Sequence, residues 1–226
     1  MKCPERPPSQ VDVEKIAGGL RHRLVDPRLL PSRQAWRRRF SPSLSFGRHF
    51  GPPQSSVRPA AVLVALEPTT EGWLIPLTMR PDHLPDHPGQ ISLPGGRLEA
   101  DELALSAALR EFHEEVGPRI PAELVVGELQ PVHVFNSNYW VTPFVAVLTQ
   151  PLDYVTCPIE VAELLHLPVS VLCDPQHHVR RRFTRGLLSW DALTIEYDRW
   201  SIWGATAIIL ADLIAPLQEA GLVSAP

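Results

Sequence analysis

Short apolar runs interrupted by Pro, Gly and Asp dominate the chain from about residue 58 onward. Four of them have the length and composition of β-strands: AAVLVALE at 60–67, GWLIPLTMR at 72–80, AELVVGELQPVHVF at 122–135 and VTPFVAVLTQ at 141–150. Two other segments, at about 101–116 and about 204–220, repeat apolar residues at helical spacing. This mixture predicts an α/β fold with a mixed sheet at its centre.

The first 57 residues differ from the rest in pattern and in charge. Ile16, Leu20 and Leu24 recur every four residues, which predicts a short amphipathic helix. Residues 1–57 carry 11 Lys and Arg against 4 Asp and Glu, a net charge of +7, whereas the remainder carries 10 against 21, a net charge of −11. We therefore expect two parts: a basic, partly helical extension over 1–57, packed on the core or at a subunit contact, and the main domain over 58–226.

Composition excludes several classes of protein. With 226 residues, 44% of them hydrophobic, the chain can bury one substantial core. No apolar run approaches the roughly 18 residues that a membrane span needs, and the first ten residues lack the apolar core of a signal peptide, so we expect a cytoplasmic protein without a membrane partner. Cys3, Cys157 and Cys173 are too scattered for a metal clip and are expected to be reduced thiols.

The helix predicted near 101–116 has two contrasting faces. At 100° per residue, one narrow stripe is apolar and is expected to be buried: Leu105, Leu109, Phe112 and Val116. Glu111, Glu114 and Glu115 point the other way, together with Ala104, Ala107 and Ala108, which leave room for something to approach. Asp101 is a candidate helix cap, and Gly117 followed by Pro118 predicts the helix end.

Crowded carboxylates destabilise a helix by a few tenths of a kcal/mol per pair, and a bound cation reverses that sign. Hard oxygen ligands of this kind select Mg²⁺ or Mn²⁺, and Mg²⁺ commonly shares its coordination shell with substrate phosphates. An exposed acidic helix face is the simple alternative, and the surrounding residues decide between the two.

Those residues follow one fixed spacing: Gly96, Glu102, Arg110-Glu111, the apolar Phe112, Glu114-Glu115, Val116 and Gly117. The pattern resembles the Nudix box of the Nudix hydrolases, and it departs only at Pro118, where the family usually has an aliphatic residue. The resemblance implies the Nudix fold, an α/β/α sandwich around a mixed sheet, whose loop–helix–loop binds a divalent metal. It also implies cleavage of a diphosphate linked to another moiety.

The resemblance also implies individual roles. Glu114 and Glu115 look like metal ligands, with the backbone carbonyl of Gly95 as an additional one. Glu111 is either a further ligand or the base that deprotonates water, Arg110 orients a glutamate, and Glu102 supports the loop. Outside the box, Glu160 in the segment CPIEVAE is a candidate assisting base.

The segment before the box, LTMRPDHLPDHPGQISLPGG at 77–96, is similar to that of the coenzyme A pyrophosphatases within the Nudix superfamily. The match rests on His87, Gly89, Gln90 and Pro94-Gly95-Gly96. Of these, His87, Gln90 and Gly96 are candidate substrate-binding residues. Coenzyme A also requires cations for its 3'-phosphate and apolar surface for its pantetheine arm. Further candidates are Arg58, Arg80, the arginines at 180–182, Tyr139, Trp140 and Phe144.

The predicted activity is metal-dependent hydrolysis of coenzyme A or acyl-coenzyme A to 4'-phosphopantetheine, free or acylated, and adenosine 3',5'-diphosphate. One alternative is a hydrolase of another nucleoside diphosphate derivative, such as ADP-ribose, a dinucleotide or an RNA 5' end. The other is a nucleotide-sensing module without activity, which would be expected to lose box carboxylates. The predicted partner is a small molecule rather than a nucleic acid, and a homodimer is left open.

Overall fold

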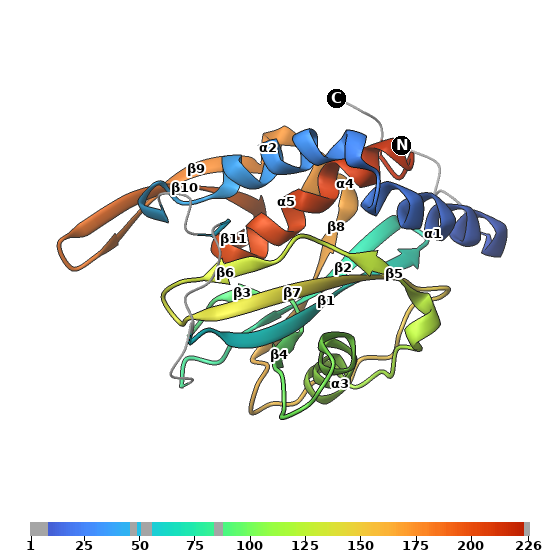
Figure 1. The fold of residues 1–226 in the computed structure, drawn as a ribbon, viewed down its shortest axis with the longest axis horizontal. Helices are drawn as coiled ribbons and strands as arrows, with labels where there is room; N and C mark the ends of the chain where they lie inside the picture. The colour runs from blue at the N-terminus through green and yellow to red at the C-terminus, as the bar shows by residue number, and fades with distance from the viewer. Residues whose placement is uncertain (1–8, 46–48, 51–55, 84–87, 224–226) are drawn as a thin grey trace.

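The structure, a computed structural model, describes residues 9–45, 49–50, 56–83 and 88–223 (Figure 1). Its α-helices are α1 (Gln10–Leu24), α2 (Leu30–Phe40), α3 (Ala104–Val116), α4 (Val169–Cys173) and α5 (Gly204–Glu219). Its strands are β1 (Arg58–Thr69), β2 (Gly72–Met79), β3 (Ile91–Ser92), β4 (Gly95–Arg97), β5 (Val125–Glu128), β6 (Val132–Val134), β7 (Tyr139–Val147), β8 (Glu163–Pro168), β9 (His178–Arg185), β10 (Leu188–Tyr197) and β11 (Trp200–Ile202). Three of the four strands predicted from residue 58 onward and both helices are present. The predicted strand at 122–135 is instead two short strands, β5 and β6, after a 3₁₀ turn, because Pro131 interrupts the run.

Strand β1 is the centre of the main sheet. It pairs in parallel with β7 along most of its length, and it pairs antiparallel with β4 at its start and with β2 at its end. The described strands of this sheet follow the order β3-β2-β1-β7-β5, with β6 on β7 and β8 on β2, so the sheet is mixed. Strands β9, β10 and β11 form a separate antiparallel sheet, whose long β9–β10 hairpin projects from the body (Figure 1).

Side chains along β1 point alternately to the two faces of the sheet, so the apolar core has two layers. Ala61, Leu63 and Ala65 pack against α3 on one face, while Val64 and Leu66 belong to the larger apolar cluster on the other. Helix α5 is nearly all buried in that larger cluster, and α1 and α2 cover it on the same side of the sheet (Figure 1). Helices therefore lie on both faces of a mixed sheet, which confirms the predicted α/β/α sandwich.

Buried arginines join α2 to α5. Arg33 is 4% exposed, and its guanidinium donates to both carboxylate oxygens of Asp212, at 2.7 and 3.0 Å. Arg37 is 2% exposed and lies 3.5 Å from the same carboxylate. The backbone N–H of Gln130 also donates to Asp212, at 3.0 Å. Part of the positive charge in the N-terminal segment is therefore neutralised inside the protein.

The faces of α3 differ from the prediction. Ala107 and Ala108, predicted to lie on the acidic face, are fully buried, whereas Leu105 and Leu109 of the predicted stripe are only half-buried. The reason is close packing on β1, because small side chains let the helix approach the alanines of that strand. The predicted cap is also wrong: the helix begins at Ala104, and its N-cap is Leu103, without a side-chain hydrogen bond. The helix ends as predicted, with Gly117 at φ 99°.

None of the helices in the described ranges is both long enough and apolar enough to cross a membrane.

Candidate active site

Two glycines place strand β4 against the start of β1. Gly95 has φ 149°, and a Cβ atom at this position would lie 2.3 Å from the carbonyl oxygen of Ala61. A Cβ atom at Gly96 would lie 2.5 Å from the carboxyl carbon of Glu111. Gly95 permits the close approach of β4 to the backbone of β1, and a side chain at Gly96 would require the Glu111 carboxylate to move.

Glu115 is the most buried acidic residue of α3, with 5% of its surface exposed. The sequence-based assignment of Glu115 to an open face was wrong, because the side chain packs beneath β4. Its carboxylate accepts a hydrogen bond from the backbone N–H of Gly95 at 3.3 Å. Glu111 lies one helical turn earlier, half-buried against Gly96.

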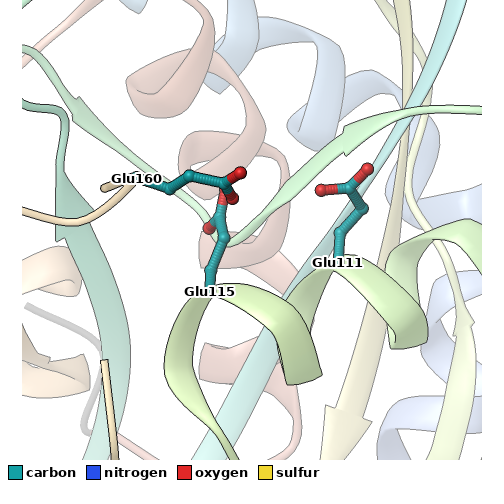
Figure 2. Close-up of side chains that lie close together, drawn as sticks. All are labelled: Glu111, Glu115 and Glu160. Carbon is teal, nitrogen blue, oxygen red and sulfur yellow. The ribbon is translucent and has the colours of Figure 1, made fainter. Parts of the chain in front are cut away.

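Glu160 reaches the same place from a distant part of the chain. The loop that follows β7 is attached to the end of α3 by two backbone hydrogen bonds, from Val155 N–H to Val116 O and from Cys157 N–H to Glu115 O, both 2.9 Å. In consequence, carboxylate oxygens of Glu111, Glu115 and Glu160 lie within 4.8 Å of one another. Figure 2 shows Glu160 approaching Glu115 from its loop, with Glu111 beside them on the helix.

The environment of this group disfavours negative charge. Burial raises the pKa of Glu115 to about 8, and the neighbouring charge of Glu111 adds to the effect. Burial likewise raises the pKa of Glu111, against the opposing influence of Arg110. Arg80 acts in the other direction on Glu115 by lowering its pKa, which indicates that Arg80 lies near the site.

This donor set fits a hard divalent cation. Carboxylate oxygens are the ligands that Mg²⁺ and Mn²⁺ prefer, and three carboxylates converge here without enough positive charge around them. The nearby guanidinium of Arg110 pairs with one carboxylate of the group, that of Glu111, and shares its charge with Glu102 and Glu114 outside the group. A divalent ion would supply the missing charge and reverse the repulsion between Glu111 and Glu115.

Arg110 organises the outer side of the site. Its Nε and Nη2 donate to the two carboxylate oxygens of Glu102, each at 2.9 Å, and Nη1 donates to Glu111 at 2.9 Å. These bonds keep Glu102 ionised by lowering its pKa, and they hold Glu111 in place. Glu102 in turn accepts from the backbone N–H of Glu99 at 2.9 Å, which closes the loop before α3.

Glu114 lies outside the three-carboxylate group. Its side chain is 52% exposed and accepts a hydrogen bond from Arg110 Nη1 at 2.9 Å. Its predicted role as a metal ligand stays a prediction, as does that of the Gly95 carbonyl.

The predicted substrate-binding residues occupy two places. Arg58 and Tyr139 face each other across β1 and β7, with the guanidinium 4.1 Å from the ring centre. Arg80 and Gln90 face each other before the box, where the N–H of Arg80 donates to the carbonyl of Gln90 at 3.0 Å. His87 lies outside the described residues.

Other candidates are engaged elsewhere. Arg181 and Arg182 form cross-strand ion pairs with Glu196 and Asp191 on the β9–β10 hairpin. Phe144 packs in the apolar cluster beneath α3.

One buried acid near this loop was missed from the sequence. Glu67, on β1, is 3% exposed and binds the segment that leads to Glu160. The only signal in the sequence is a single acidic residue at the end of the apolar run AAVLVALE.

Comparison with known proteins agrees with this geometry. The family model for the NUDIX domain matches residues 57–184. Over 165 residues the chain is 38% identical to the Nudix hydrolase NudL of Enterobacter sp. strain 638, a match that covers 69% of this chain and 81% of that protein. It is 37% identical to NudL of Yersinia pestis strain Pestoides F, covering 69% and 78% of the two chains.

A solved structure supports the fold. The MutT/nudix family protein from Enterococcus faecalis superposes with a TM-score of 0.50 at 14% identity, over 85% of this chain and 80% of that one. The family model and the NudL relatives show that the chain belongs to the Nudix hydrolase family. At the level that the family defines, it is a hydrolase of a nucleoside diphosphate derivative.

Proposed function

We propose that this Nudix hydrolase cleaves the diphosphate bond of coenzyme A or an acyl-coenzyme A, releasing 4'-phosphopantetheine or its acyl form and adenosine 3',5'-diphosphate. The convergence of Glu111, Glu115 and Glu160 supports the hydrolytic chemistry. The resemblance of residues 77–96 to the coenzyme A pyrophosphatases supports the substrate.

Glu111 and Glu115, on α3, have a different role in this proposal from the exposed Glu160. Glu111 and Glu115 would hold Mg²⁺ or Mn²⁺, which neutralises the charge of a diphosphate and positions water. Glu160 is exposed and therefore reaches solvent, so it accepts the proton of the attacking water. The water oxygen bonds to one phosphorus, the bond from that phosphorus to the bridging oxygen breaks, and the bridging oxygen leaves on the other phosphate.

The residues around the carboxylates would position Glu111 and the substrate. Arg110 holds Glu111 through one hydrogen bond and is itself held by Glu102 through two. Arg58, Arg80, His87, Gln90, Gly96 and Tyr139 remain the proposed substrate-binding residues. Arg80 is favoured among the cations because its charge acts on Glu115.

We also propose the division of the chain into an extension over 1–57 and a catalytic domain over 58–226. The burial of Arg33 and Arg37 against Asp212 supports an extension that packs on the core. It also disfavours an RNA 5' end as substrate, because these two charges are unavailable to a polymer.

A substrate panel tests the proposed activity. The full chain would be assayed on coenzyme A, dephospho-coenzyme A, ADP-ribose, a dinucleotide and a capped RNA, with Mg²⁺, Mn²⁺ or EDTA, and the products would be identified by mass. We expect metal-dependent cleavage with coenzyme A as the best substrate. Loss of the 3'-phosphate should lower kcat/KM by about one to two orders of magnitude, in line with roughly 1.5–3 kcal/mol for a hydrogen bond to a charged group.

The panel also separates the alternatives. Equal kcat/KM on ADP-ribose and coenzyme A would contradict the coenzyme A assignment and leave the diphosphatase chemistry intact. Binding of a nucleotide without any product would favour the sensing module.

A further inference from the structure

Glu67 is a buried acid on the face of β1 that carries the active-site helix. It follows Ala61, Leu63 and Ala65 at alternate positions, and it is 3% exposed. An unpaired buried carboxylate is strongly unfavourable, so its hydrogen bonds account for its presence. Its carboxylate accepts one bond from the backbone N–H of Leu152 and one from the hydroxyl of Tyr154, both 2.8 Å.

Both donors lie in the loop between β7 and β8, a few residues before Glu160. After Tyr154, the N–H groups of Val155 and Cys157 donate to the end of α3, and at the far end of the loop Ala162 donates to Met79 of β2 at 2.8 Å. The ring of His166 also packs edge-on against Tyr154, with the ring centres 5.1 Å apart. Glu67 thus attaches the loop to the sheet before the loop contacts α3, and β2 attaches it again after that contact.

We propose that Glu67 and Tyr154 are positioning residues that set the place of Glu160 in the three-carboxylate group. Glu160 has no regular secondary structure to hold it, and its backbone is fixed through Cys157, to which its own N–H donates at 3.1 Å. The Tyr154–Glu67 bond fixes the segment that delivers Cys157 to α3. The inference rests on the proposed function, in which Glu160 takes the proton from water.

Conservative variants isolate the hydrogen bond between Tyr154 and Glu67. Tyr154→Phe removes one hydroxyl and keeps the ring against His166. Glu67→Gln preserves both contacts, because an amide oxygen can accept from Leu152 and the amide nitrogen can donate to the tyrosine oxygen. Tyr197→Phe on β10, which packs against the cluster on the opposite face of the sheet, is the matched control.

We expect Tyr154→Phe to lower kcat about tenfold with KM nearly unchanged, and Glu67→Gln and Tyr197→Phe to stay within about twofold of the wild type. A double-variant cycle then separates positioning from a general structural effect. In a Glu160→Gln background, Tyr154→Phe should produce no further loss, since both changes act through one carboxylate. Equal losses in both backgrounds, or wild-type kcat in Tyr154→Phe, would overturn the proposal.

Two readouts are independent of turnover. Hydrogen exchange at the Val155 and Cys157 amides should be about tenfold faster in Tyr154→Phe and unchanged in Tyr197→Phe. Binding of Mn²⁺ alone, measured by calorimetry, should weaken in the same variant, because a displaced Glu160 no longer adds its negative charge beside Glu111 and Glu115. If the wild type cleaves none of the diphosphates, the proposed function fails, and these two measurements still decide the positioning role: unchanged exchange and Mn²⁺ affinity reject it, and the expected changes support it.

Discussion

Gly96 and Glu111 are packed so closely that no methyl group fits between them, since a Cβ atom at Gly96 would lie 2.5 Å from the Glu111 carboxyl carbon. Gly96→Ala should therefore displace the Glu111 carboxylate and lower kcat/KM by about a hundredfold, the usual effect of a shift near 1 Å in an active site.

The control for this change is Gly18→Ala in the middle of α1, where an added Cβ meets no atom within 4 Å. That variant should keep full activity and gain up to about 1 kcal/mol in unfolding free energy, because alanine is the better helix former. If Gly96→Ala and Gly18→Ala were equally active, activity would not depend on the observed position of the Glu111 carboxylate.

Arg110→Lys tests the organisation of the outer side of the site. Lysine keeps the charge and loses the fork that binds both oxygens of Glu102 and also reaches Glu111. We expect kcat to fall by about ten- to a hundredfold, with little change in the melting temperature. Arg119→Lys, an exposed arginine just after the helix, should behave as the wild type. Matching kinetics for the two variants would contradict the positioning role of Arg110.

The metal-free protein should become less stable as pH rises. The pKa of Glu115 is about 8 in the folded protein against an ordinary value of 4.5. Between these values the folded state retains a proton that the unfolded chain has released, so each increase in pH favours unfolding, by at most about 1.4 kcal/mol per pH unit. Chemical unfolding of the wild type and Glu115→Gln in EDTA, from pH 5 to pH 8, measures the difference.

The wild type should lose stability relative to Glu115→Gln across that range. Mg²⁺ displaces the proton, so it should raise the melting temperature more at pH 8 than at pH 6. Parallel stability curves for the two proteins would mean that the carboxyl of Glu115 titrates as it does in water.

The Arg33–Asp212 pair should matter for stability and not for chemistry. Asp212→Asn leaves Arg33 and Arg37 buried without their counter-charge, which costs about 3–5 kcal/mol of unfolding free energy. The fraction that remains folded should turn over substrate at the wild-type rate, as measured by kcat normalised to folded protein. A loss below 1 kcal/mol would indicate that solvent reaches the pair.

The contacts around Arg110 could be predicted from the sequence, whereas the burial of Glu115 could not. Gly96, Glu102, Arg110 and Glu111 lie within sixteen residues at fixed spacing, and their mutual contacts follow from one loop and one helix. The burial of Glu115 did not follow, because helical periodicity assigns acidic residues to solvent and contains no information about β4 above them.

Contacts between distant segments escaped the sequence patterns for the same reason. Arg33 and Asp212 are 179 residues apart, and only the packing of α2 on α5 brings them together. The approach of Glu160 likewise depends on backbone hydrogen bonds from Cys157 and Val155, which no side-chain pattern encodes. The β9–β10 hairpin was not predicted, because its run of arginines resembles an exposed face more than a strand.

Titration with Mn²⁺ in the absence of substrate tests most directly whether Glu111 and Glu115 hold a metal in the three-carboxylate group. The wild type, Glu115→Gln and a control at an exposed residue, Glu123→Gln, would be compared by calorimetry and by the electron paramagnetic resonance of free Mn²⁺. We predict a bound ion in the wild type and in Glu123→Gln, at least about tenfold weaker binding in Glu115→Gln, and a parallel loss of metal-dependent turnover. Equal Mn²⁺ affinity in all three proteins would contradict the account, because the most buried of the three carboxylates would then play no part in holding the metal.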